Sequence, residues 1–301
     1  MASFSLIQPS AEEISSLDFF DKIALVAHNC YQVEAKDHEN NIAFVNRLVK
    51  AGHLARIEHY RFLLSFPYAR KERLLSLNDP YLTLASSLNG KEVLVSFSLR
   101  PVFEHRDSPL YRSLLAPLPS SLKENLSLPR VLPRQGEERL TLDKAKTRVS
   151  KKDYDRLFFP TYHLITDRGV THELVRHRPC SFAQESTRYC NYTKGKFSSS
   201  LTFLTPLGYE KEKEVYDRYF LSVTETYFRL IEDGLKPEEA RSVLPNSLKA
   251  SIRVSASREE WKHIFSLRLS PFAHPDIRKV MGLVLDDREK KGYIQKDELQ
   301  G

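Results

Sequence analysis

Apolar residues recur at intervals of three and four in several parts of the chain, the spacing that lines one face of an α-helix. This pattern predicts a helix over residues 17–31 and a second over residues 42–49, with Gly52 as its end. A longer helix is predicted over residues 209–233, and Gly234 ends it. The helical period is therefore present in both halves of the chain.

A further helix is predicted to begin after Ser257. The Ser257 hydroxyl suits an N-cap, and Glu260 stands three places on, as in a capping box. Trp261, Ile264 and Phe265 then bring one side of this helix to the core. The helix also carries polar residues whose possible roles are considered below.

Four short stretches predict β-strands, because they are apolar and rich in β-branched or aromatic residues. These strands are residues 60–66, 93–97, 157–166 and 201–204. The third strand leads into a turn at Gly169, which can adopt positive φ. After that turn, a short helix is predicted over residues 173–176.

Thr166 or Thr171 is expected to cap this short helix. The chain beyond residue 176 is expected to be an irregular loop. Loops held by a rigid frame are where binding groups concentrate, so this loop is a candidate site.

Residues 107–152 differ in character from the rest of the chain. Several prolines interrupt them, apolar residues are sparse, and a charged tract ends the stretch. This composition predicts a surface segment with one short helix. We interpret it as an insertion within a single domain that spans residues 1–301, and a true domain boundary is the alternative.

The composition fits a globular protein with an ample core. The chain has 301 residues, of which 41% are hydrophobic and 28% charged. The formal net charge is +7 and the isoelectric point is about 9.1. A basic protein suits nucleotides and equally suits nucleic acid, so charge alone does not choose a ligand.

The three cysteines do not form a recognisable framework. Cys30, Cys180 and Cys190 are odd in number and lack short paired spacing, which argues against disulfides or a zinc knuckle. The first residues do not resemble a secretory signal, and no stretch is apolar enough to span a bilayer. These features predict a cytoplasmic location and no membrane partner.

The most distinctive stretch is residues 176–188. It begins with Arg176-His177-Arg178 and, after seven further residues, ends with Ser186-Thr187-Arg188. Guanidinium groups present planar forks of donors that suit phosphate and carbonyl-rich rings. One loop that holds both groups would form an anion and nucleotide site. The alternative is a solvated basic face.

The order Arg-His-Arg, seven residues, Ser-x-Arg resembles the motif of the flavin-dependent thymidylate synthases. The flanking residues 167–175 and 189–192 also resemble that family, and further pieces recur in the family's order. The resemblance implies an α+β fold with a central, mostly antiparallel sheet flanked by helices. It also implies reductive methylation of dUMP to dTMP, with FAD as hydride carrier, methylenetetrahydrofolate as carbon donor and NADPH as reductant.

The resemblance also implies which residues form the site. Arg268 would be the catalytic residue that activates the uracil. The residues implied to bind dUMP are Glu173, Arg176, Gln184, Glu185, Ser186, Thr187, Arg188, Arg241 and Arg268. The residues implied to contact FAD are Arg176, His177, Arg178, Gln184, His53, Glu58 and His263. The family works as a homotetramer with its sites between subunits.

Each of these assignments has a simpler structural alternative. His53 and Glu58 lie in a segment that is also a polar turn before a strand, and its histidines are not spaced like a His-Glu-x-x-His metal site. Arg241 is alternatively a residue that extends its charge to solvent from the edge of the core. His263 and Arg268 are five residues apart, so they do not share one narrow helical face. His263 is alternatively a satisfied histidine at the edge of the core, and Arg268 a surface charge. No metal site is predicted.

Two positions depart from the family pattern. Ser98 and Ser257 stand where asparagines are common, and a hydroxyl reproduces an amide only partly. Two rival functions are therefore considered. One is a diverged flavin-binding relative that acts on another pyrimidine nucleotide, and the other is a basic nucleic-acid-binding protein without catalysis.

The uracil chemistry requires donors rather than a protein nucleophile. C5 of uracil becomes nucleophilic when negative charge is drawn to N3 and the carbonyl oxygens, and arginine keeps the charge that stabilises it. Cys180 lies beside Arg178, but we interpret Cys180 and Cys190 as structural. No Gly-x-Gly-x-x-Gly sequence occurs, so a Rossmann domain is not supported.

Overall fold

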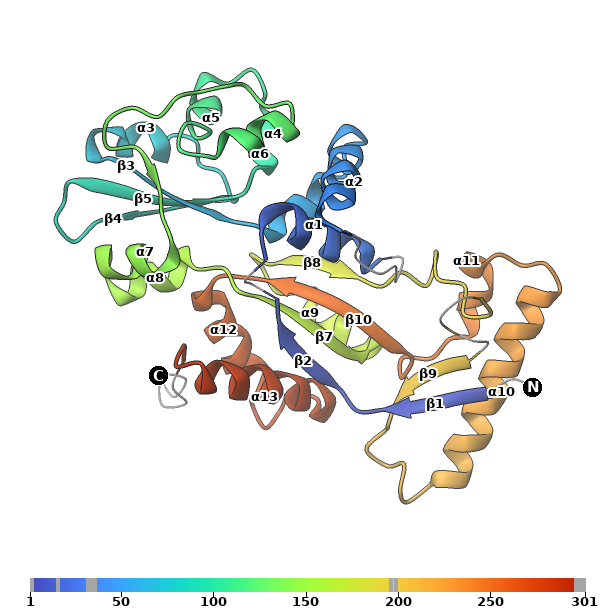
Figure 1. The fold of residues 1–301 in the computed structure, drawn as a ribbon. Helices are drawn as coiled ribbons and strands as arrows, with labels where there is room; N and C mark the ends of the chain where they lie inside the picture. Colours follow the sequence, from blue (N-terminus) through green and yellow to red (C-terminus); the bar gives the residue numbers. More distant parts are fainter. Residues whose placement is uncertain (1–2, 15–16, 31–36, 195–196, 198–199, 295–301) are drawn as a thin grey trace.

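The structure is a computed structural model that describes residues 3–14, 17–30, 37–194, 197 and 200–294. Helices and antiparallel sheets are both prominent, which confirms the predicted α+β class (Figure 1). The strands do not form one central sheet. They form two four-stranded antiparallel sheets and a parallel pair.

The first sheet, here called the site sheet, has the order β2-β7-β10-β8. Its strands are β2 (Ser10–Glu13), β7 (Thr161–Asp167), β10 (Lys249–Ser255) and β8 (Ser181–Gln184). Helices α12 (Arg258–Arg268) and α13 (Pro275–Lys290) cover one side of it (Figure 1). Buried Tyr162, Ile252 and Trp261 belong to the core between the sheet and these helices.

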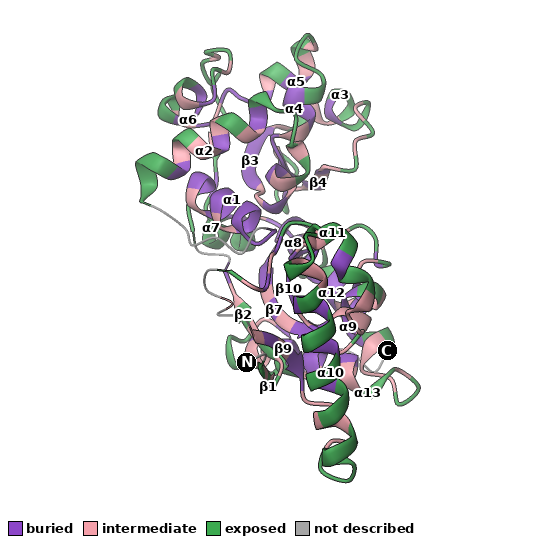
Figure 2. Cartoon of the chain, turned by 90° about the vertical axis from the view of Figure 1, so that its right-hand side faces the viewer, coloured by how far each residue is buried: buried purple, intermediate pink, exposed green. Residues whose placement is uncertain are grey.

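The site sheet continues at one end into a parallel pair of strands. Strands β1 (Ser3–Ile7) and β9 (Ser200–Leu204) pair in parallel, and helix α10 (Lys213–Glu232) lies along them. The apolar face of α10 is buried against this pair, whereas its outer face is exposed (Figure 2). The short helix α11 (Pro237–Ala240) and the 3₁₀ turn η4 (Arg241–Val243) follow.

The second sheet lies in a separate layer above the first, with the order β4-β5-β3-β6. Its strands are β3 (Phe62–Pro67), β4 (Leu82–Ser86), β5 (Glu92–Phe97) and β6 (Glu138–Arg139). Around it lie the short elements η2 (Tyr68–Arg70), α3 (Lys71–Leu75) and α4 (Arg100–Glu104). Helix α1 (Phe19–His28) and the 3₁₀ helix η1 (Leu54–His59) lie between this layer and the site sheet (Figure 1). Helix α2 (His38–Lys50) packs against α1 and contributes to the core of the second sheet.

Residues 107–152 are more ordered than their composition predicts. They contain α5 (Pro109–Ser113), α6 (Ser120–Asn125), strand β6 and α7 (Leu142–Arg148), and α8 (Lys151–Leu157) begins within them. Leu114, Leu115 and Leu118 are buried in the same core cluster as the second sheet. The prediction of a surface segment with one short helix is therefore wrong, because the sparse leucines fall where they close a core.

Other predicted elements are present with shifted bounds. The helix predicted at residues 173–176 is α9 (Arg168–Leu174), which begins five residues earlier. Its N-cap is Asp167 and not Thr166 or Thr171, since the Asp167 carboxylate accepts from the backbone N–H of Val170 at 2.7 Å. A carboxylate one residue before the helix reaches the free amides more directly than either threonine.

We expect Leu115→Ala to lower the free energy of unfolding by about 2–5 kcal/mol, because the side chain is fully buried and its removal leaves a cavity. Urea unfolding followed by circular dichroism measures this change. The matched control is Leu132→Ala at a 69% exposed position, where little change is expected. Equal effects at the two positions would show that residues 107–152 are not part of the core.

Candidate active site

The 176–188 motif begins after α9 and runs into strand β8 at the edge of the site sheet. The prediction of a wholly irregular loop is therefore wrong for Ser181–Gln184, which pair with residues 252–255 of β10. The strand fixes the second half of the motif, while residues 175–180 form the turn that carries the Arg-His-Arg group. The motif is thus attached to the frame at both ends.

Arg268, at the last turn of α12, meets this turn directly. Its Nε donates to Nε2 of His177 at 2.9 Å. Its terminal nitrogens donate to the Glu173 carboxylate at 2.7 Å and to the Glu173 carbonyl at 3.2 Å. Arg268 and the predicted residues Glu173 and His177, which lie more than 90 positions earlier, therefore form one cluster.

His177 is held as a neutral imidazole. Burial, together with the positive charge of Arg268, lowers the pKa of His177 to about 4. Because Nε2 accepts from Arg268, the proton lies on Nδ1. A neutral ring at this position accepts from the guanidinium and does not repel it.

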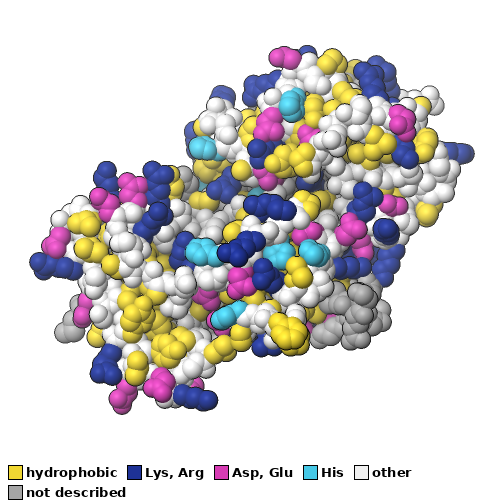
Figure 3. Space-filling model, turned by 180° about the vertical axis from the view of Figure 1, so that it is seen from behind, with side chains coloured by type: hydrophobic (Ala, Val, Ile, Leu, Met, Phe, Trp, Pro, Cys, Tyr) yellow, Lys and Arg dark blue, Asp and Glu magenta, His cyan; other side chains and the backbone are white. Residues whose placement is uncertain are grey.

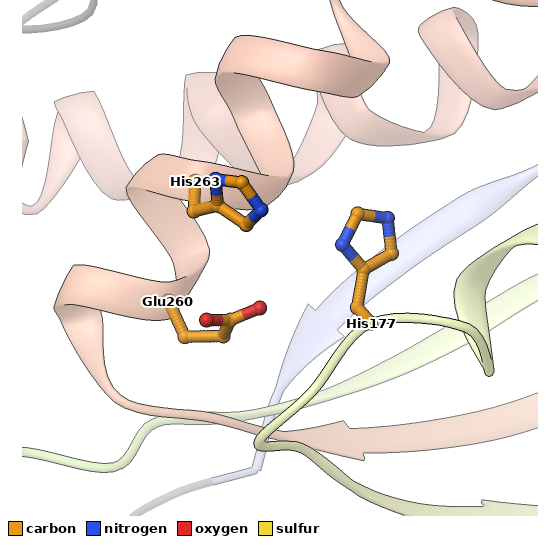
Figure 4. Close-up of side chains that lie close together, drawn as sticks. All are labelled: His177, Glu260 and His263. Carbon is orange, nitrogen blue, oxygen red and sulfur yellow. The ribbon is translucent and has the colours of Figure 1, made fainter.

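His263 and Glu260 complete this cluster on the α12 side (Figure 4). The rings of His177 and His263 are 6.1 Å apart, and one ligand atom from each of His177, Glu260 and His263 lies within 4.8 Å of the others. His263 and Arg268 do not share a narrow helical face. The imidazole of His177 nevertheless contacts both residues.

This spacing is geometrically compatible with a divalent cation. However, the His177 Nε2 lone pair already accepts from Arg268, and the adjacent guanidinium opposes a second positive charge. We therefore assign no metal here. A second group of suitable spacing among the described residues, Asp18, Asp21 and His38, lies on the surface and engages in its own hydrogen bonds.

Glu58, predicted to contact FAD, lies on the other side of the Arg-His-Arg turn. Its carboxylate accepts from Ser181 Oγ at 3.0 Å and is paired with Arg100. It also borders a pocket of about 340 Å³ whose walls include Arg178 and Phe182. The Arg178 guanidinium lies over the Phe182 ring, 5.7 Å from its centroid.

Gln184 and Glu185 of the motif point to different surroundings. Gln184 donates from Nε2 to the Thr171 hydroxyl at 2.9 Å, which ties β8 to α9. The Glu185 carboxylate is buried, where it accepts from Tyr192 at 3.0 Å and pairs with Lys249 at 2.7 Å. Glu185 therefore supports the motif from inside the protein.

The Ser-Thr-Arg end of the motif lies near α11. Arg188 is exposed and donates from Nε to Glu238 at 2.8 Å. The positive charges of Arg188 and, more weakly, Arg241 lower the pKa of Glu238. Thr187 is buried, and the Ser186 hydroxyl accepts from the backbone N–H of Arg188 at 3.3 Å.

Arg176 and His53 are both exposed. Within the described ranges, their side chains have no hydrogen bond or ion pair, and no distance links them to the Arg268 cluster. Basic side chains and histidines nevertheless gather in a band across the middle of one face (Figure 3). The two residues therefore remain predicted contacts only.

The three cysteines are free, and none is poised as a nucleophile. Burial and the nearby Glu260 carboxylate raise the pKa of the Cys180 thiol, outweighing the charge of Arg178. Burial likewise raises the pKa of Cys30. These environments favour the thiol, which agrees with a structural interpretation.

Sequence reasoning gave no site role to Glu260, Arg100 or Thr171. A signal existed for Glu260, because it lies three residues before His263 and so on the same face of α12. The roles of Arg100 and Thr171 depend on pairing across elements. The sequence pattern of a single segment does not predict such contacts.

The comparisons with known proteins concern mainly the C-terminal part of the chain. Residues 159–291 match the family model described as thymidylate synthase complementing protein. A flavin-dependent thymidylate synthase of Pyrococcus furiosus is 35% identical over 131 residues, covering 42% of this chain and 53% of the relative. That of Sulfurisphaera tokodaii is 34% identical over 124 residues, covering 41% of this chain and 47% of the relative.

A solved structure of thymidylate synthase X from Helicobacter pylori, with FAD and dUMP, is also similar. It is 19% identical, with a TM-score of 0.41, and the match covers 50% of this chain and 77% of that one. The chain spans about half the length of the curated relatives it matches. Over the matched region, the chain is therefore similar to the flavin-dependent thymidylate synthases.

Proposed function

We propose that this protein catalyses the reductive methylation of dUMP to dTMP. Methylenetetrahydrofolate would donate the carbon, and FAD reduced by NADPH would carry the hydride. The observation that carries the proposal is the anchoring of Arg268 by His177 and Glu173, two residues of the family's motif region. This cluster suits activation of a uracil ring by a fixed cation.

Arg268 is well prepared for that task. Its three hydrogen bonds hold the guanidinium in one orientation, and within the described residues its remaining N–H groups have no partner. Those groups would donate to the uracil as negative charge develops on its carbonyl oxygens. A preorganised donor of this kind lowers a barrier by roughly 3–4 kcal/mol.

Glu173 and His177 would act on Arg268 in different ways. The Glu173 carboxylate fixes one edge of the guanidinium and balances part of its charge. The neutral His177 ring fixes Nε without competing for the substrate's charge. Arg268 thus stays cationic and oriented whether or not the nucleotide is bound.

The residues beside the Arg-His-Arg turn fit a flavin nucleotide. The pocket near Glu58 combines aromatic Phe182 with the guanidinium of Arg178, which suits a planar ring system and an anionic linker. Arg176, His177, Gln184, His53 and His263 remain the other proposed contacts. When bound, the flavin supplies hydride transfer, which protein side chains cannot perform.

The dUMP phosphate would be held by the Ser-Thr-Arg end of the motif. Arg188 and Arg241 both lie near the carboxylate of Glu238, so the phosphate would replace or share that partner of Arg188. We assign Glu185 and Thr187 a supporting role, because both are buried. The remaining nucleotide contacts would come from Arg176, Gln184 and Ser186.

The proposal includes a homotetramer with sites between subunits, as the resemblance implies. It also includes a single domain over residues 1–301, a cytoplasmic location and no nucleic-acid partner. Within the described residues, no helix is both long and apolar enough to cross a membrane.

The proposed function is tested by rescue of a host that requires thymidine. We expect the chain to restore growth without thymidine and Arg268→Ala to abolish it, with kcat lowered about 10²–10³-fold in vitro. Arg229→Ala, an exposed position on α10, is the matched control and should rescue fully. Failure of the parent chain to rescue, in a soluble flavin-loaded form, would refute the proposal.

Glu260 gives a test that does not depend on activity. Burial and the neighbouring Glu259 raise the pKa of Glu260 from 4.5 to about 7. The folded protein therefore holds this proton more tightly than the unfolded chain, and its stability falls as the pH rises from 4.5 to about 7. Glu260→Gln should remove that loss. The free energy of unfolding of the variant, relative to that of the parent, should therefore be higher at about pH 8 than at about pH 5.

Urea unfolding of both proteins at the two pH values measures this difference. The control is Glu225→Gln at an exposed position of α10, where the pH dependence should match that of the parent. If Glu260→Gln shows the parent's pH dependence, the carboxyl is not held in its neutral form.

Cys180→Ala should leave turnover within severalfold of the parent, because the raised pKa keeps the thiol protonated and Arg268 supplies the activation. Steady-state assays of dTMP formation measure this. A loss comparable to that of Arg268→Ala would instead assign Cys180 a nucleophilic role.

A further inference from the structure

A second pocket lies away from the Arg268 cluster, between α1, β3, β6 and the α7–α8 region. Its volume is about 610 Å³, which suits a ligand of nucleotide size. The residues of its wall that bear on ligand chemistry are Lys22, Tyr60, Arg61, Arg139, Phe158 and Phe159. None of the proposed dUMP or FAD contacts belongs to this wall.

Lys22 is an unusual residue for this position. Its side chain projects from α1, is only 4% exposed, and has no hydrogen bond or ion pair within the part of the chain that the structure describes. The Tyr60 ring centroid lies 5.8 Å from its Nζ. The carboxylate of Glu13, which influences Lys22, is already paired with Lys291 at 2.7 Å.

An ammonium group buried without a partner is costly unless it loses its proton or gains an anion. Burial accordingly lowers the pKa of Lys22 to about 7. An anion in the pocket would remove the cost. The burial of Lys22 therefore indicates that the pocket binds an anionic group.

Two further cations share the same wall. The Arg61 guanidinium lies 4.4 Å from the centroid of the Phe159 ring, and its Nε is buried without a hydrogen bond among the described residues. Arg139 is exposed and lies over Phe62, 5.6 Å from its centroid. The residues that line the pocket include no aspartate or glutamate.

We propose that this pocket binds an aromatic anion, a planar ring that carries a carboxylate or phosphate group. The three cations would hold the anionic group, with Lys22 as its innermost partner. Tyr60, Phe158 and Phe159 would contact the ring. A nucleotide and an aromatic carboxylate share this chemistry, and the experiment below separates them.

The site is independent of the proposed function, since its argument uses none of the residues assigned to catalysis. It adjoins the pocket near Glu58, because Arg61 and Phe159 line both. An occupant would therefore lie next to the proposed flavin site. Arg139, Leu140 and Leu142 of the wall come from residues 107–152, which gives that segment a role in binding.

Binding should be coupled to protonation of Lys22. Tyr60, His59 and Glu13 interact with Lys22, and Arg61 and Arg139 line the same pocket. Burial keeps His59 neutral by lowering its pKa, and the arginines stay charged at neutral pH. Affinity for an anion should therefore fall as the pH rises through about 7.

The first experiment labels the lysine with pyridoxal 5′-phosphate, an aromatic phosphate that carries an aldehyde. The amine nitrogen of Lys22 adds to the aldehyde carbon, water leaves and an imine forms. Borohydride then delivers hydride to the imine carbon and leaves a stable secondary amine, which peptide mass spectrometry locates. We expect Lys22 to react at least about tenfold faster than the exposed control Lys91, because a lowered pKa of about 7 leaves a larger share of its amine unprotonated near neutral pH and the pocket holds the phosphate.

Protection of Lys22 against the label identifies the ligand class. Thymidine monophosphate, p-aminobenzoylglutamate and inorganic phosphate are compared at about pH 6.5 and about pH 8.5. Protection by either aromatic anion, stronger than by inorganic phosphate and weaker at the higher pH, supports the proposal. The better protector then tells a nucleotide from an aromatic carboxylate.

Two variants provide controls. Lys22→Met keeps an unbranched chain and should abolish the label in this pocket, while Arg139→Gln keeps Lys22 and should slow its labelling about tenfold. Arg139 is exposed, so this variant remains informative if Lys22→Met does not fold. The proposal is overturned if Lys22 reacts no faster than Lys91, if inorganic phosphate protects as well as the aromatic anions, or if Arg139→Gln has no effect.

Discussion

The site depends on the fixation of one guanidinium by two partners of different kinds. Arg268 is held by the carboxylate of Glu173 and by the neutral ring of His177. A second carboxylate in place of the imidazole would neutralise the arginine further, and a charged imidazolium would repel it. Because burial and Arg268 itself keep His177 neutral, the cation remains fixed and still available to a substrate.

The fold is arranged so that three chain segments reach this point. Helix α9 supplies Glu173, the turn after it supplies His177, and the last turn of α12 supplies Arg268. Gln184 ties β8 to α9, and the buried Glu185 pairs with Lys249 at the start of β10. The motif residues that do not reach the cluster therefore stabilise the strand on which it depends.

The sequence predicted those elements whose patterns are self-contained. The helical period located α1, α2, α10 and α12, and the Ser257 cap is confirmed, since its hydroxyl accepts from the Glu260 amide at 3.0 Å. Strand β8 was missed because its polar residues read as a loop, although burial alternates along it. The contact between His177 and Arg268 joins residues 91 positions apart. It depends on the tertiary fold, and no local sequence pattern predicts it.

The two departures from the family pattern bear on the rival of a diverged relative. Ser98 is fully buried, donates to the Ile57 carbonyl at 3.2 Å and accepts from the backbone N–H of Arg100 at 3.2 Å. It thereby positions Arg100, which pairs with Glu58. Ser257 caps the helix that carries Arg268. Both hydroxyls therefore form hydrogen bonds that organise elements bearing site residues, and these structural roles do not themselves favour a different substrate.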